Sequence, residues 1–147
     1  MIIETNHLGK IEYSVNDIVT FSHGIPGFED EKQFILVPAE DIEFPFSYLQ
    51  SVKSNDLAFI VTDPFLFVEN YDFELSSTDS SALNIESEEA LANISVLTIV
   101  TIPDDVDKTT INIMAPIVIN HEAKVGRQVL LHEYSDSKFP LFRKIGE

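Results

Sequence analysis

The sequence contains no cysteine, so disulfide bonds, thiolate metal ligands and a cysteine nucleophile are all excluded. It also lacks a long hydrophobic run, since the longest apolar-rich stretch, 91–102, is too short and too rich in Ser and Thr to cross a bilayer. The N-terminal MIIETNHLGK has neither the basic start nor the apolar centre of a secretory signal peptide. These absences fit a reducing compartment, and we expect a cytoplasmic protein.

Basic residues are scarce. The chain has 9 Lys and Arg against 25 Asp and Glu, which gives a formal net charge of -16. Nucleic acids and anionic membranes repel such a surface, because phosphate binding requires clustered Lys and Arg. We therefore predict no direct nucleic-acid partner and no membrane partner. A basic protein would be attracted at long range, whereas a role of the charge in solubility alone is an equally open interpretation.

Recognisable catalytic and cofactor-binding motifs are missing as well. The four histidines are scattered, the glycines match no nucleotide-binding loop, and no serine stands in G-x-S-x-G. The segment DDVD lacks the spacing of an EF-hand loop. We therefore predict no catalytic residues, no cofactor and no metal site. The rival class is a hydrolase that uses scattered carboxylates, and no convergent nucleophile or ligand set supports it.

What the sequence does contain is alternation of apolar and polar residues with a period of two. The clearest case is TINIMAPIVIN, residues 110–120, which predicts a strand rather than a helix. Pro116 cannot donate to a ladder, so we expect this strand at a sheet edge or bulged there. Further strands are predicted over 17–21, 34–37, 57–62, 93–103 and 126–134, and helical signals are limited to 77–85 and 87–94.

Neither helical segment is long enough to bridge a parallel pair of strands comfortably. The expected fold is therefore mainly β, a single-domain antiparallel barrel-like or sandwich fold with a few short helical connections. The β-rich domain is expected over residues 1–135, followed by a short C-terminal tail over 136–147.

The stretch FSHGIPGFED, residues 21–30, combines two glycines with a proline. Pro26 suits the second place of a type II turn, and Gly27 suits the third place, which requires a positive φ. Gly24 frees the backbone just before the turn. A phosphate-binding loop is disfavoured, because Pro26 offers no N–H and acidic residues follow at once. We predict that Gly24, Pro26 and Gly27 form a structural corner.

Aromatic residues gather in two segments. FPFSYLQS carries Phe44, Phe46 and Tyr48, and 63–73 carries Phe65 and three further rings. Core packing accounts for most such rings, but rings that stay exposed would anchor a protein partner.

Five segments, in this order and spacing, carry a resemblance to a known family. They are GIPGFE (24–29), PFSYLQS (45–51), AFIVTDPF (58–65), NIMAPIVIN (112–120) and GRQVLL (126–131). Over nearly the whole chain they resemble the bacterial flagellar assembly factor FliW family, whose length and acidity also agree.

The resemblance implies a β-rich, barrel-like, non-enzymatic cytoplasmic regulator. Proteins of this family bind newly made flagellin, and they also bind CsrA, a small dimeric RNA-binding protein that represses flagellin translation. Partner exchange then couples the flagellin level to flagellin translation. Flagellin's terminal segments are disordered before assembly and apolar on one helix face. An acceptor for them would be a groove lined by rings or an edge strand.

Two candidate sites follow from this resemblance. We predict that Phe44, Phe46, Tyr48 and Gln50 line a flagellin-binding groove. The predicted CsrA-binding acidic surface consists of Glu29, Asp30, Glu31, Glu40, Asp41 and Glu43, although acidic clumps most often mark solvated turns. We expect a monomer. The alternative is a peptide- or carbohydrate-binding β module unrelated to flagella.

Overall fold

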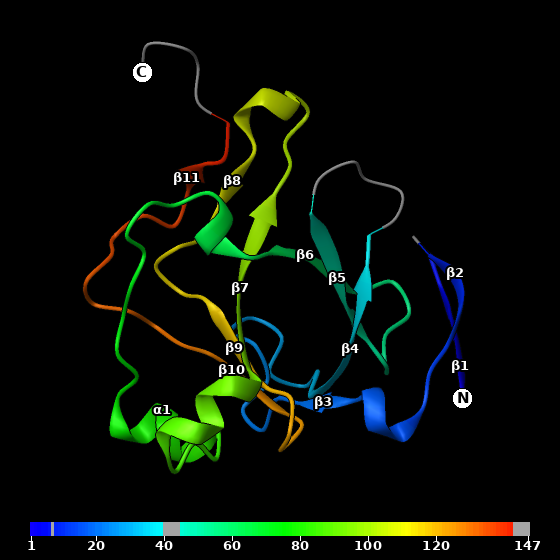
Figure 1. Ribbon diagram of the computed structural model, residues 1–147. Helices are drawn as coiled ribbons and strands as arrows, with labels where there is room; N and C mark the ends of the chain where they lie inside the picture. The colour runs from blue at the N-terminus through cyan, green and yellow to red at the C-terminus, as the bar shows by residue number, and fades with distance from the viewer. Residues whose placement is uncertain (7, 40–44, 143–147) are drawn as a thin grey trace.

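A computed structural model describes residues 1–6, 8–39 and 45–142 (Figure 1). The strands are β1 (Ile2–Thr5), β2 (Gly9–Glu12), β3 (Val19–Thr20), β4 (Gln33–Pro38), β5 (Phe46–Ser51), β6 (Ala58–Thr62), β7 (Ile94–Thr101), β8 (Thr110–Ile111), β9 (Ile117–Asn120), β10 (Val125–Gln128) and β11 (Phe139–Pro140). The helices are α1 (Ser77–Ala82) and the short 3-10 turns η1 (Val15–Asp17), η2 (Pro64–Leu66), η3 (Glu88–Asn93) and η4 (Val106–Lys108).

The centre of the fold is a closed barrel of seven strands, in the order β7-β6-β5-β4-β3-β10-β9, which closes because β9 also pairs with β7. Neighbouring strands are antiparallel except β3 and β10, which meet at Thr20 and Val125. The end of β7 continues beyond the barrel to pair with β8, which pairs with β11, and β1 and β2 form a separate hairpin beside the barrel (Figure 1). The prediction of a mainly β, single-domain, barrel-like fold with few short helices is confirmed.

Two hydrophobic clusters cover opposite faces of the curved sheet. The Phe21 cluster contains Phe21, Phe34, Leu49, Ile117 and Ile119, all fully buried, and the rings of Phe21 and Phe34 meet edge-to-face with centroids 5.3 Å apart. The Tyr71 cluster on the other face contains Tyr71, Leu83 and Val118, together with side chains from β5, β8 and the segments after β6 and β10. Strand β9 is therefore buried on both faces.

The strand predicted over 110–120 is interrupted in the structure, and its part after Pro116 does not lie at a sheet edge. It is divided into β8 and β9 by a turn in which the Asn112 carboxamide oxygen accepts hydrogen bonds from the backbone N–H groups of Met114 and Ala115, each at 3.2 Å. Pro116 is buried, and its carbonyl accepts from the N–H of Val129 at 2.9 Å. Strand β9 pairs on both sides, with β7 and β10, so it offers no free edge to a partner.

The described part of the expected C-terminal tail is built into the sheet. Strand β11 pairs with β8, Leu141 is buried in the Tyr71 cluster, and its N–H donates to the carbonyl of Thr109 at 2.9 Å. Both sheet pairing and apolar burial therefore hold residues 136–142 against the domain.

Candidate partner-binding surfaces

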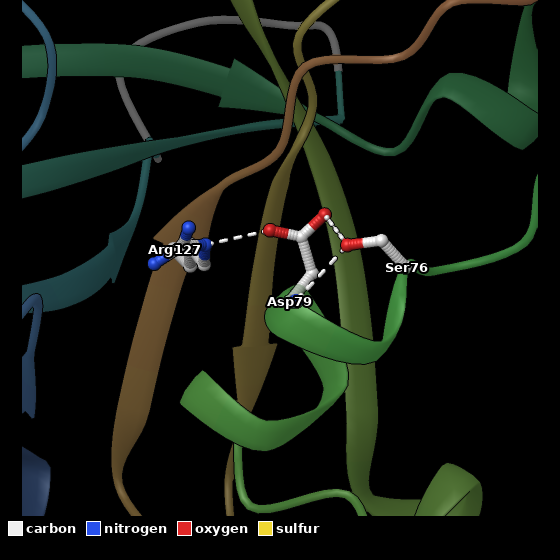
Figure 2. A network of polar contacts seen from close by, with 3 residues as sticks. All are labelled: Ser76, Asp79 and Arg127. Carbon is white, nitrogen blue, oxygen red and sulfur yellow. Dashed lines mark hydrogen bonds and ion pairs between the residues drawn. The ribbon is translucent and has the colours of Figure 1, made fainter.

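Residues 74–93, here called the cover segment, cross the face of the sheet that carries the Tyr71 cluster. Helix α1 begins in this segment because Ser76 caps it, with its hydroxyl accepting from the N–H of Asp79 at 3.1 Å and donating to the Asp79 carboxylate at 2.9 Å. The other oxygen of that carboxylate accepts from Nε of Arg127 on β10 at 2.7 Å (Figure 2). One carboxylate thus fixes the first turn of α1 and ties it to the barrel.

A second attachment of the cover segment lies where α1 ends. Leu83 is fully buried, and its carbonyl accepts a hydrogen bond of 2.8 Å from the side-chain amide of Asn120 on β9. Burial of Leu83 excludes water from this bond, so breaking it leaves two polar groups without partners. The cover segment is therefore held at both ends of its helix.

Between the cover segment and the segment after β6 lies an open apolar groove of about 480 Å³. Its wall on one side comes from the cover segment and includes Leu75, Ile85 and Leu91, its floor comes from β7 and β9, and its other wall includes Phe65 and Phe73. The volume is in the range of small-molecule and peptide-anchor pockets, about 300–1,000 Å³. The groove offers mostly apolar surface to a ligand.

The Phe65 wall is held in place by a buried tyrosine. The Tyr71 hydroxyl donates to the carbonyl of Ile113 at 2.7 Å, and its ring contacts those of Phe65 and Phe73, each with centroids 5.7 Å apart. Burial raises the pKa of the Tyr71 phenol well above its ordinary value of 10.0. The phenol therefore stays protonated near neutral pH and keeps its role as a donor.

Two exposed side chains flank the groove. Phe65 and Leu91 are each 52% exposed, although both are large and apolar. Three carboxylates, those of Asp72, Glu74 and Glu88, also line it. The groove thus combines apolar anchoring surface with an acidic rim.

The residues predicted for a flagellin-binding groove are placed elsewhere. Phe46 and Tyr48 are buried in the Tyr71 cluster, and Gln50 is fully buried, while Phe44 lies outside the described residues. Phe46 and Tyr48 alternate along β5 and share one of its faces, and the Tyr71 cluster covers that face. The prediction that these side chains line a surface groove is therefore corrected, because Phe46, Tyr48 and Gln50 lie in the interior.

Gln50 serves the local backbone. Its side-chain NH2 group donates to the carbonyls of Ser51, Ser54 and Asn55 at 3.0, 3.3 and 3.4 Å. These carbonyls belong to the last residue of β5 and to the turn that follows it, so Gln50 holds the start of that turn from inside.

The corner contains, over residues 25–28, the type II turn that the sequence suggests. Gly27 has a φ of +89°, and the N–H of Phe28 donates to the carbonyl of Ile25 at 2.7 Å. Gly24 has a φ of +67°, and a Cβ atom there would lie 2.6 Å from the Cα of Glu29. The corner thus folds back so tightly that only glycine fits at position 24.

The three acidic residues that follow the corner differ in whether their side chains make contacts within the protein. Glu29 and Asp30 are exposed, whereas Glu31 accepts hydrogen bonds from the hydroxyls of Ser51, at 2.6 Å, and Ser54. These two donors hold the pKa of Glu31 below its ordinary value of 4.5. Glu40, Asp41 and Glu43 lie outside the described residues. Of the described residues of the predicted acidic surface, Glu29 and Asp30 are exposed, and one oxygen of the Glu29 carboxylate accepts from the N–H of Gly27 at 3.2 Å.

The contacts of Glu31 predict acid sensitivity. Because its pKa is lower in the folded state, its stabilisation is present above about pH 4.5 and is lost as the pH falls through the folded-state value. We expect Glu31→Gln to lower the free energy of unfolding at pH 7 by on the order of 1 kcal/mol, since solvent screens this partly exposed group. Urea unfolding between pH 3 and pH 7 should show a flatter pH profile in Glu31→Gln. Glu12→Gln, an exposed change on β2, is the control, and equal profiles for the two variants would contradict this role of Glu31.

The described residues contain no group of three His, Asp or Glu side chains placed to hold a metal ion. Within the same ranges, no helix combines the length and apolarity needed to cross a membrane. By its architecture, the protein is a single-domain closed β-barrel that presents an open apolar groove with an acidic rim.

The chain belongs to the FliW family, because the family model described as FliW protein matches residues 2–144. The flagellar assembly factor FliW of Bacillus subtilis (strain 168) is 39% identical over 142 residues, which cover 96% of each chain. That of Alkaliphilus metalliredigens (strain QYMF) is 43% identical over 131 residues, covering 89% of this chain and 79% of the relative. A crystal structure of the flagellar assembly factor FliW superimposes with a TM-score of 0.88 at 38% identity, covering 99% of both chains.

The sequence pointed to only one wall of the groove. Phe65 and Phe73 belong to the aromatic segment over 63–73, and Phe65 is the ring of that segment that stays exposed. Leu91 and Ile85 were not identified, because they lie in short segments that show no amphipathic pattern. The sequence feature that indicates this side of the groove is a large apolar residue, Leu91, just after the acidic pair Glu88 and Glu89.

Proposed function

We propose that this chain is a non-enzymatic flagellar assembly factor of the cytoplasm that binds flagellin and also binds and antagonises CsrA. The observation that carries this proposal is the family match over residues 2–144. In this mechanism, abundant flagellin occupies the protein and leaves CsrA free to repress flagellin translation. Export of flagellin returns the protein to CsrA and lifts the repression.

The charge of the chain supports the CsrA part of the proposal. CsrA must present basic residues to RNA, and a partner of net charge -16 attracts such a surface. Glu29 and Asp30 stand exposed beside a rigid corner, which holds their charge in a fixed position. Electrostatic steering of this kind raises association rates by about 10- to 1,000-fold at low salt.

We therefore expect CsrA binding to depend strongly on ionic strength. Raising the salt concentration from 50 to 500 mM should slow association by about tenfold or more, because the Debye length falls from roughly 14 Å to 4 Å. Stopped-flow or surface-plasmon measurements of the association rate test this. Glu29→Gln combined with Asp30→Asn should reduce the salt dependence, with Glu4→Gln combined with Glu12→Gln, two exposed carboxylates on the β1–β2 hairpin, as the charge-matched control. An association rate that does not change with salt would contradict the electrostatic part of the proposal.

Partner switching has its own test. Tagged protein should recover flagellin and CsrA from lysate of its own cells, and purified flagellin should release CsrA from the complex in a titration followed by size-exclusion chromatography. Recovery of neither partner by the folded protein would refute the proposal and leave the peptide- or carbohydrate-binding module as the better interpretation. Stable ternary complexes with no release would refute the switch alone.

A further inference from the structure

We propose that the open apolar groove beside the cover segment is the docking site for an amphipathic helical segment of flagellin. This assignment rests on the proposed function, which supplies the partner, and goes beyond it by naming the surface. The groove takes the place of the predicted Phe46 and Tyr48 surface, whose side chains are buried.

The shape and chemistry of the groove fit the apolar face of a helix. Its floor contains Ile94, Val96 and Val118, and Phe65 and Leu91 stand on its two sides, each 52% exposed. Helices that bind in grooves insert apolar side chains at positions i, i+3, i+4 and i+7 between such walls. Docking would remove the exposed surfaces of Phe65 and Leu91 from water, which favours binding through the hydrophobic effect.

The acidic rim selects among possible occupants. Asp72, Glu74 and Glu88 would pair with Lys or Arg at the borders of the helix's apolar face. A second copy of this chain is disfavoured, because two surfaces of this kind would bring like charges together on proteins of net charge -16. A small anionic ligand is disfavoured for the same reason.

The groove is also formed before any partner arrives. The Asp79–Arg127 ion pair of 2.7 Å (Figure 2) and the Asn120–Leu83 hydrogen bond fix one wall. The Tyr71–Ile113 hydrogen bond fixes the other wall. A preformed site does not have to be ordered when the partner binds, which favours capture of a segment that is itself disordered beforehand. Flagellin's unassembled terminal segments have this property, whereas CsrA is a folded basic dimer.

The direct test is the variant Leu91→Ser. It should weaken binding of purified monomeric flagellin at least tenfold in isothermal titration calorimetry, with unchanged affinity for CsrA and an unchanged melting temperature. Leu130→Ser is the matched control, because Leu130 is also exposed, at 59%, and does not line the groove. Unchanged flagellin affinity in Leu91→Ser, or an equal loss of both partners, would overturn the assignment of this groove to flagellin. If the wild-type protein binds neither partner, the proposed function fails together with this inference.

The absence of cysteine allows a second measurement on the intact chain. Single variants Leu91→Cys and Leu130→Cys can each be labelled with an environment-sensitive fluorophore at one known position. Flagellin should shift the emission of the label at position 91 to shorter wavelength and leave the label at position 130 unchanged. A shift only at position 130 would place flagellin outside the groove and overturn the inference.

The rim is tested separately. Glu88→Lys should weaken flagellin binding several-fold at low salt and less at high salt, since the change reverses a charge that lines the groove. Glu4→Lys makes the same change of net charge on the β1–β2 hairpin and should have a much smaller effect. Equal effects of the two variants would show that only the net charge matters and would overturn the role of the rim.

Discussion

Gly24→Ala should destabilise the protein by about 2–5 kcal/mol. A left-handed backbone conformation costs an L-residue about 1–2 kcal/mol, and Gly24 has a φ of +67°. The new Cβ would also lie 2.6 Å from the Cα of Glu29, and forcing backbone atoms apart in a packed region costs about 1–3 kcal/mol. Because domains of this size are stable by only about 5–15 kcal/mol, the loss should be plain in urea unfolding.

Gly27→Ala provides the comparison for Gly24→Ala. Gly27 also has a positive φ, +89°, but a Cβ there would meet nothing within 4 Å. Gly27→Ala should therefore lower the free energy of unfolding by only the conformational cost of about 1–2 kcal/mol. Equal losses of unfolding free energy in the two variants would mean that the backbone at Glu29 moves freely to make room for the new Cβ, and would contradict the tight packing at Gly24.

Phe21→Ala should cost about 3–5 kcal/mol, the range observed when a fully buried Phe is truncated. The ring packs between Phe34 and the backbone of Gly126, where a Cβ would lie 2.5 Å from the Cζ atom of Phe21. Gly126→Ala alone should therefore destabilise by about 1–3 kcal/mol through overpacking. In the Phe21→Ala background the added methyl group enters the space that the ring has left.

The two substitutions should therefore be non-additive, with a coupling of about 1–3 kcal/mol in a double-mutant cycle measured by chemical denaturation. Gly126→Ala should be neutral or stabilising when Phe21 is already Ala. Strict additivity would show that the ring and the glycine do not share one space and that the Phe21 cluster relaxes around the change.

The corner around Gly24 shows which features the local sequence predicts and which it does not. Pro26 and Gly27 predict their turn because the required dihedral angles are properties of those residues themselves. The end of the corner was less predictable. Glu29, Asp30 and Glu31 are adjacent acidic residues that the sequence does not distinguish. Only Glu31 accepts hydrogen bonds from Ser51 and Ser54, which lie about twenty residues further along the chain.

The period-two pattern also has limits. It identifies strand-forming residues correctly around 117–120, but Asn112 interrupts the ladder by bonding to the backbone N–H groups that follow it. An isolated asparagine within an alternating run does not show whether the strand is interrupted there, because the same pattern also suits a continuous strand.

The sequence alone determined the β class, the glycine corner, the net charge and the family, because alternation, turn dihedrals, composition and ordered motifs are all read along the chain. Only the tertiary structure decided which apolar side chains remain in contact with water. Phe46 and Phe65 are the same residue type in similar aromatic segments, yet one is buried in the Tyr71 cluster and the other is 52% exposed. The difference depends on which segments pack over each ring, and the cover segment, tied down by Arg127 and Asn120, leaves the groove beside Phe65 open.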